Sequence, residues 1–341
     1  MSSSCGRNVV VTLFGESHGP GVGCVIDGFP AGFTPDMDAV AAFMARRAPG
    51  KAPGSTPRAE ADLPRILSGM HDGRTTGAPI TALIENINTR SGDYSDLVRK
   101  PRPGHADYTL HVKTGGANDP RGGGHSSGRV TAGLCFAGAL AIQYLAAKEV
   151  AIKSRITAIA GSAVSCKTDE YGLDEAARAA IDAARRDGDS VGGVVECVIE
   201  GLPAGLGDPM FDGVENRIAS IVFGIPAVKG VEFGSGFAGS ALRGSVNNDP
   251  FIFNDLGGVR TRTNNHGGAL GGITSGMPVV FRVAIKPTPS ISIPQDTVDI
   301  QTGKCCRIEI KGRHDACIVP RARPVVEAAA ALAALDLLLD P

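Results

Sequence analysis

The chain has 341 residues, 43% of them hydrophobic, and a formal net charge of -1. A chain of this length can bury a large core, and its near-neutral charge gives no electrostatic reason to expect binding to nucleic acid or an anionic membrane. We therefore expect a soluble, globular protein. Because no Pro/Ser-rich linker or charge run marks a boundary, we expect one domain over residues 1–341.

The two ends of the chain carry no predicted targeting or membrane segment. Residues 1–11 have no sustained apolar stretch behind a basic segment, so they do not resemble a signal peptide and we expect a cytoplasmic protein. The apolar run at 325–339 is interrupted by Glu327 and Asp336 and is shorter than the roughly 20 residues that span a bilayer. It predicts a buried core helix.

Strand and helix patterns follow one another without strict alternation. Short runs rich in β-branched residues and bounded by Gly or Pro predict strands at 8–14, 22–27, 80–84, 151–160, 194–199, 279–284 and 307–310. Helical patterns, several opened by Asp or Pro, cover 35–47, 129–149, 173–186, 209–222 and 324–339. This order predicts an α+β fold of largely antiparallel sheets with helices packed on them, rather than a doubly wound parallel sheet.

Two of the predicted helices differ in the surface they present. The helix at 129–149 is apolar almost all round, which indicates that it lies between other layers. The helix at 173–186 is charged on one face and is expected to face water.

The eight cysteines are scattered without a C-x-x-C pair or zinc-finger spacing, so we expect most to be small buried apolar residues. His314, Asp315 and Cys317 form one short cluster, which is weak evidence for a metal, and we predict no metal site.

Three glycine-rich loops carry histidine: GESHG at 15–19, RPGHAD at 102–107 and PRGGGHSSGR at 120–129. Histidine suits proton transfer near neutral pH, and flanking glycines let a ligand approach the backbone. Any one of these histidines could instead be solvated or bonded within its loop. Three histidines in similar glycine-rich loops favour a catalytic or ligand-binding site.

Many arginines surround these loops. Guanidinium groups bind phosphate and carboxylate bidentately, so a small polyanion is a natural ligand if several converge. They could equally be surface charges balanced by the 35 acidic residues. They are Arg46, Arg47, Arg102, Arg121, Arg129, Arg260, Arg262, Arg313, Arg321 and Arg323.

The run at 120–129 leads directly into the apolar helix. Ser126, Ser127 and the neighbouring backbone N–H groups could hold an anion there, or one of these serines could be only an N-cap.

Familiar nucleotide and hydrolase signatures are missing. The chain has no G-x-x-x-x-G-K-[ST] or H-E-x-x-H motif. Gly234, Gly236 and Gly239 match G-x-G-x-x-G, and Asp255 follows, but the residues after Gly239 contain Gly, Asn and Pro and would not form the required helix. A Rossmann site is therefore not expected.

Taken together, the loops resemble the signature set of the chorismate synthase family, in the family's order, over roughly residues 7–340. The matching stretches are TLFGESHGPGVGCVIDGFPAG, RRAPG, SGDYSDL with RPGHADYT, RGGGHSSGRVTAG, NNHGGALGGITSGMPVVFRVAIKPTPSI and GRHDACIVPRARPVVEA.

The resemblance implies a fold, a reaction and partners. The fold would be a β-α-β sandwich of antiparallel sheets with a buried helical layer, assembled into homotetramers. The reaction would be the 1,4-anti elimination of phosphate from 5-enolpyruvylshikimate 3-phosphate, giving chorismate with the help of reduced FMN, in the shikimate pathway of aromatic amino-acid biosynthesis. We expect a monofunctional enzyme supplied with reduced FMN by an external flavin reductase or another source.

The resemblance also implies site residues. His18 is similar to the general acid that protonates the leaving phosphate, His105 to the residue that tunes or protonates the reduced flavin near N1, and Asp315 to the group beside flavin N5. Residues implied to bind substrate are Arg47, Ser127, Arg129 and Arg313. Residues implied to bind the flavin are His125, Ser126, Ser127, Pro226, Ala227, Gly271, Lys286, Pro287, Thr288, Pro289, Ser290 and Arg313.

Four positions depart from the family pattern: His125 and Pro53 replace arginines, Pro226 replaces an asparagine, and Pro289 replaces a small hydroxyl residue. Arg58 is a hypothetical substitute for the charge missing at position 53.

Two other readings stay open. A true FMN-dependent oxidoreductase acting on a small acid would consume NAD(P)H, whereas a non-catalytic phosphate-ligand binding protein would need the arginines but not the histidines.

Overall fold

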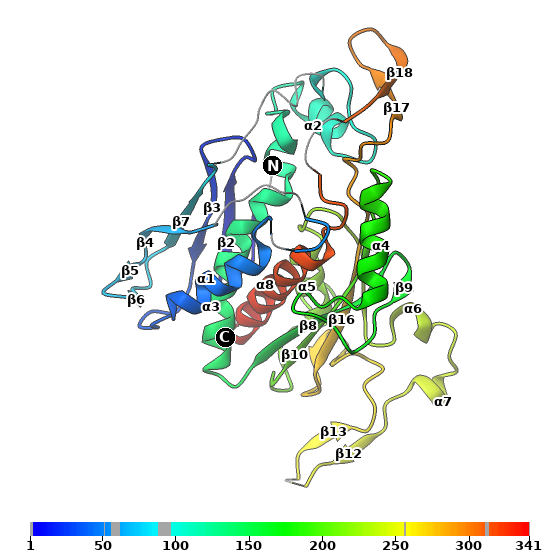
Figure 1. Ribbon diagram of the computed structural model, residues 1–341. Helices are drawn as coiled ribbons and strands as arrows, with labels where there is room; N and C mark the ends of the chain where they lie inside the picture. The colour runs from blue at the N-terminus through cyan, green and yellow to red at the C-terminus, as the bar shows by residue number, and fades with distance from the viewer. Residues whose placement is uncertain are drawn as a thin grey trace.

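The computed structural model describes residues 3–50, 52–55, 62–87, 97–255, 257–310 and 314–340. It contains two five-stranded antiparallel sheets with a layer of helices between them (Figure 1). In spatial order, the first sheet consists of β1 (Ser4–Cys5), β2 (Val10–Gly15), β3 (Gly21–Asp27), β7 (Ile80–Glu85) and β4 (Arg65–Ser68).

The second sheet alternates buried and accessible side chains along its central strands, as expected for strands with one face on the core. In β10, for example, Val195, Cys197 and Ile199 are buried. The strands in spatial order are β11 (Val228–Phe233), β16 (Val279–Ile285), β10 (Gly193–Glu200), β8 (Ala151–Ile159) and β9 (Ser162–Ala163).

Helices α3 (Thr131–Ala146) and α8 (Val319–Leu338) form the centre of the helical layer. α3 packs on β3 of the first sheet, α8 packs on β8 and β10 of the second, and the two helices pack on each other. Their close approach requires Gly138, since a methyl group there would lie 2.2 Å from the Cβ of Ala328. The layer is therefore joined to both sheets by direct packing.

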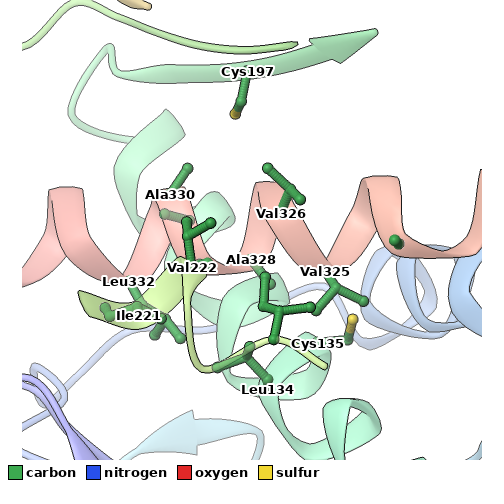
Figure 2. Packing of buried hydrophobic residues seen from close by; sticks show 14 of the residues in the cluster. Leu134, Cys135, Cys197, Ile221, Val222, Val325, Val326, Ala328, Ala330 and Leu332 are labelled. Carbon is green, nitrogen blue, oxygen red and sulfur yellow. The ribbon is translucent and has the colours of Figure 1, made fainter. Parts of the chain in front are cut away.

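Figure 2 shows how other elements enclose α8. α1 (Met37–Arg47) and α5 (Val214–Val222) also contact it. Each apolar side chain fully removed from water here stabilises the fold by about 1.5–3 kcal/mol. The labelled neighbours of α8 are Cys197 of β10, Ile221 and Val222 of α5, and Leu134 and Cys135 of α3.

The remaining elements lie outside the two main sheets. Two of them are the helices α2 (Asp107–Thr114) and α4 (Glu175–Arg186). Later in the chain, an arm carries the short helices α6 (Gly236–Gly239) and α7 (Gly244–Asn247). The arm ends in the hairpin of β12 (Phe251–Phe253) and β13 (Val259–Thr261) (Figure 1). The others are β5 (Met70–His71), β6 (Arg74–Thr75), η2 (Arg121–Ser126), η3 (Gly128–Val130), β14 (Ala269–Leu270), β15 (Ile273–Thr274), β17 (Gln295–Asp299) and β18 (Lys304–Ile308).

The prediction of an α+β fold with antiparallel sheets and a buried helical layer is confirmed. The buried C-terminal helix is also confirmed, because nearly all of α8 is buried. Within the described residues one helical stretch, Gly128–Ala146, is long and apolar enough to cross a membrane, but most of it is buried inside the fold, as in a core helix. α4 is amphipathic as expected, with Ala177, Ile181 and Ala184 on its buried face.

Several local predictions were wrong. The last predicted strand is shifted, since β18 runs Lys304–Ile308 and not over 307–310. α8 begins at Val319, before the predicted start, because Pro320 lies in its first turn, where a proline costs no hydrogen bond. Of the eight cysteines only four are buried, while Cys166 and Cys305 are exposed.

Candidate active site

A cavity of about 990 Å³ opens between the first sheet, the start of α3 and the loop that follows β16. It is large enough for a cofactor and a small substrate. Segments far apart in the sequence supply its wall: the N-terminal strand β1, the loop before α2, the glycine-rich run of η2 and η3, the end of α5, and the loops at 286–290 and 314–318.

Most of the residues proposed from the sequence lie on this cavity. Two of the three expected catalytic residues, His105 and Asp315, line it. So do nine of the twelve expected flavin-binding residues: His125, Ser126, Ser127, Pro226, Ala227, Lys286, Thr288, Pro289 and Ser290.

The other expected residues lie elsewhere or cannot be placed. Pro287 belongs to the cavity loop without lining it, and Gly271 lies in the turn between β14 and β15, away from the lining that the structure describes. Arg313 and the hypothetical substitute Arg58 fall outside the described residues.

His18 lies behind the cavity wall, with 8% of its surface exposed. The His18 ring packs against Gly122, which lines the cavity: a methyl group added at Gly122 would lie 2.4 Å from His18 Cε1. Gly122 has a φ of 60°, in the left-handed region that glycine adopts readily. The backbone N–H of Ser17 donates to the Gly124 carbonyl at 3.1 Å, which holds the first histidine loop against the third.

His105 is fixed by a carboxylate two residues later in the chain. Its Nδ1 lies 2.7 Å from Asp107 Oδ1, so Nδ1 carries the donated proton. The opposite ring edge faces the glycine-rich loop, since a methyl group at Gly123 would lie 3.0 Å from His105 Nε2. Asp107 therefore orients the His105 ring so that Nε2 is directed toward the wall of the cavity.

Arg102 completes this unit. Its Nε and Nη2 each donate to Asp107 at 2.8 Å, and its Nη1 donates to Ser290 Oγ at 3.0 Å. Burial would raise the pKa of Asp107, but the hydrogen bonds from Arg102 and His105 outweigh it and hold the pKa well below its usual range. The sequence marks Arg102 as a candidate, whereas Asp107, the last residue of the same RPGHAD run, was not predicted.

Arg47 and Arg129, the two described arginines implied to bind substrate, converge on one carboxylate, that of Asp62. Neither arginine lines the cavity, but Arg47 donates to the Gly128 carbonyl and to Thr131 Oγ1, and both of those residues do. Burial raises the pKa of Asp62, but the charges and hydrogen bonds of both arginines lower it by more, so the net shift is downward. Asp62 was not predicted as a site residue because no motif marks it.

Asp315 is held by Arg321 of α8. Arg321 Nη1 lies 3.0 Å from each oxygen of Asp315, and its Nε donates to the Arg47 carbonyl at 3.0 Å. Burial lowers the pKa of the Arg321 guanidinium, and the neighbouring carboxylate of Asp315 partly offsets this. One buried arginine thus joins the cavity carboxylate to the helix end that carries Arg47.

The structure shows roles for His125 and Ser127 within the fold. His125 Nδ1 lies 2.7 Å from the Gly15 carbonyl, which can only accept, so Nε2 at 2.9 Å accepts from the Ser3 hydroxyl in the neutral ring. Ser127 is an N-cap, as one alternative held, because its hydroxyl accepts from the Arg129 N–H. Both side chains still line the cavity.

Two lysines stand on the cavity wall near the 286–290 loop. Burial, together with the like charge of Lys229, lowers the pKa of Lys286. Both residues line the cavity. Lys229 was missed because a single lysine in a strand carries no motif.

These contacts define a class of protein, an α+β enzyme whose cavity combines cationic side chains with an oriented histidine and a held carboxylate, as suits chemistry on a small anionic ligand.

Comparisons with known proteins agree. A family model described as chorismate synthase matches residues 9–339. A chorismate synthase of Chitinophaga pinensis is 49% identical over 337 residues, covering 99% of this chain and 96% of the relative. One of Korarchaeum cryptofilum is 45% identical over 350 residues, covering 97% and 96%. A solved structure titled as a crystal structure of chorismate synthase superposes with a TM-score of 0.74 at 26% identity, covering 98% of this chain and 92% of that one.

The chain therefore belongs to the chorismate synthase family, and its activity is that of the carbon–oxygen lyase that forms chorismate.

Proposed function

We propose that the chain converts 5-enolpyruvylshikimate 3-phosphate into chorismate by 1,4-anti elimination, with reduced FMN bound in the cavity of about 990 Å³. The elimination breaks the allylic C–O bond to phosphate and one ring C–H bond and forms a C=C bond, so it involves no net oxidation. The observation that carries the proposal is that His105, Asp315 and Lys286 meet on one cavity in a member of this family.

The cavity residues fit a phosphorylated cofactor. Lys286 and Lys229 supply positive charge at one place on the wall, and a phosphate there would offset both the burial and the repulsion by Lys229 that lower the pKa of Lys286. Thr288 Oγ1 is buried without a hydrogen-bond partner among the described residues, so a ligand oxygen or nitrogen can satisfy it. The chemistry that reduced FMN supplies when bound is electron density for the departing allylic phosphate and acceptance of the hydrogen at N5.

Arg47 and Arg129 would bind the phosphate or carboxylates of the substrate. They are fixed before substrate arrives, since Arg47 Nε donates to Thr131 Oγ1 at 3.3 Å and Arg129 Nε donates to Asn86 Oδ1 at 2.8 Å. Positioned guanidinium groups stabilise developing phosphate charge without reorganising.

The two histidines would handle protons. His18 would protonate the leaving phosphate, and its position against Gly122 holds its ring beside the cavity wall. His105, whose Nδ1 is fixed by Asp107, would present Nε2 to the flavin near N1.

Asp315 would lie beside flavin N5. The contact from Arg321 Nη1 to both of its oxygens keeps the carboxylate in one orientation. A fixed carboxylate there can hold or accept a proton during turnover.

Substitution of the histidines separates this proposal from a non-catalytic binding protein. We expect His18→Ala and His105→Ala each to lower kcat by about 100-fold or more while binding of 5-enolpyruvylshikimate 3-phosphate, measured by calorimetry, stays near the wild-type value. Full turnover in the double variant would contradict the assignment. Consumption of one NAD(P)H per product would indicate an oxidoreductase.

The proposal includes a homotetramer. The arm from α6 to β13 exposes large apolar side chains, which is typical of a surface covered by another subunit: Phe237, Leu242, Val246, Phe251, Phe253 and Val259. We expect light scattering to give four times the mass of the chain, and expect Phe251→Ser combined with Phe253→Ser to give smaller species.

We also propose that the enzyme works in the cytoplasm and depends on an external source of reduced FMN, such as a flavin reductase. Addition of oxidised FMN and NADPH alone should then give no turnover until a reductase is added. Turnover without it would show that the chain reduces flavin itself.

A further inference from the structure

The carboxylate of Asp62 lies between the two arginines that are proposed to bind substrate. Its side chain has no exposed surface, and those of Arg47 and Arg129 are 4% and 5% exposed. Its backbone φ is 51°, a left-handed conformation that costs energy for a residue other than glycine. A strained backbone and a fully buried charge together indicate that this carboxylate is held where the two guanidinium groups need an anion.

Every nitrogen of these two guanidinium groups already donates to an oxygen of the protein. Arg47 donates to Thr131, Gly128 and Asp62. Arg129 donates to Asn86, the Glu85 carbonyl and Asp62. Of these acceptors only Asp62 is charged, so it is the one that most resembles a substrate oxygen.

We propose that Asp62 is an internal counter-anion that occupies the position of a substrate phosphate or carboxylate on the Arg47 and Arg129 pair, and that substrate binds there by displacing it. This rests on the proposed function, which assigns the two arginines to substrate.

Charge makes displacement more favourable than binding beside Asp62. Two buried arginines and one carboxylate leave a single positive charge, whereas the pair without Asp62 offers two positive charges to a doubly charged phosphate. An anion held next to the Asp62 carboxylate would also meet like-charge repulsion in a poorly solvated site. Asp62 therefore lowers the affinity for anions while it stabilises the buried arginines.

The test is Asp62→Asn, which removes the charge and keeps the shape. We expect the Kd for inorganic phosphate and for 5-enolpyruvylshikimate 3-phosphate, measured by calorimetry, to fall at least about tenfold, because the competing anion is gone. We also expect a lower Tm without ligand and a larger rise in Tm on adding phosphate than in wild type, because phosphate replaces the missing counter-anion. This second readout applies even if the variant is too unstable for calorimetry.

A matched control is Asp336→Asn. It removes another buried carboxylate paired with an arginine, Arg217, at the C-terminal end of α8. It should lower Tm without changing the Kd for phosphate or substrate.

Unchanged or weaker anion binding by Asp62→Asn, with no extra rise in Tm in phosphate, would overturn the exchange, that is, the displacement of Asp62 by substrate. Arg129→Gln separates this failure from failure of the proposed function. If Arg129→Gln weakens substrate binding but Asp62→Asn does not tighten it, only the exchange is wrong. If Arg129→Gln has no effect on substrate binding, the assignment of the arginines to substrate is itself wrong, and the exchange fails with it.

Discussion

Replacing Gly122 by alanine should disable His18 by pushing its ring out of place, although His18 itself is unchanged. The added methyl group would lie 2.4 Å from His18 Cε1 and 2.5 Å from Nδ1. Since carbon atoms pack at about 3.5–4.0 Å, the ring must move by roughly 1 Å or more. A displacement of that size can cost a catalytic group about 100-fold in rate.

Gly161→Ala is the matched control. Gly161 has a φ of 80° and nothing within 4 Å of an added methyl group, so its substitution carries the left-handed strain without any contact to His18. Both variants should therefore lose about 1–2 kcal/mol of stability through left-handed strain, and Gly122→Ala should lose more because its methyl group displaces His18.

The assay is steady-state formation of chorismate with excess reduced FMN, together with thermal unfolding of each variant. We expect kcat of Gly122→Ala to fall about 100-fold and kcat of Gly161→Ala to stay near wild type, both measured at a temperature where each variant is folded. Wild-type kcat in a folded Gly122→Ala variant would refute the placement of His18 in the mechanism.

Three further predictions concern buried charges. Asp336→Ala should lower the free energy of unfolding by about 3–5 kcal/mol in urea titrations, because it leaves three backbone N–H groups near the N-terminus without their acceptor and removes one of the two carboxylates, Asp336 and Asp340, that pair with Arg217. A loss below about 1 kcal/mol would contradict this. Arg321→Gln should lower kcat by up to about 100-fold with little change in substrate Kd, because Arg321 orients Asp315 and does not bind substrate. Arg321→Lys should recover part of the lost kcat. Equal losses in kcat and affinity would point to a merely structural role. The folded-state pKa of Asp107 lies below that of the unfolded chain, about 3.9, so its carboxylate contributes stability above that pH and loses it as the pH falls. The gap in unfolding free energy between wild type and Asp107→Asn should thus stay constant from pH 6 to 8 and shrink steadily below about pH 4, and a gap that keeps its full neutral-pH size at pH 2 would contradict the assignment.

The fold was largely predictable because the apolar periodicity, and the glycines that bound the segments, match the helices and strands of the structure. The apolar run after Arg129 could only be a helix buried on all sides, and α3 is that helix. The G-x-G-x-x-G match at 234–239 was rightly rejected, since the helix after β11 is α6, which has only four residues. α2 was missed because the RPGHAD run reads as a loop, although its last residue, Asp107, begins the helix.

The candidate site was predictable where a motif marks it and not elsewhere. The glycine-rich loops mark the histidines as candidates, and two of these histidines, His105 and His125, line the cavity. Asp62 and Lys229 contribute through contacts between distant segments, and no local pattern encodes such a contact. Tertiary packing alone brings Asp62 to Arg129.

The most direct test of the account is the stoichiometry of turnover in the absence of oxygen. The purified protein is mixed with reduced FMN and 5-enolpyruvylshikimate 3-phosphate, and phosphate, chorismate and flavin oxidation state are followed together. We expect equal amounts of phosphate and chorismate, many turnovers per flavin and no net flavin oxidation. Flavin oxidised in proportion to product, or tight binding of substrate with no phosphate released, would contradict it.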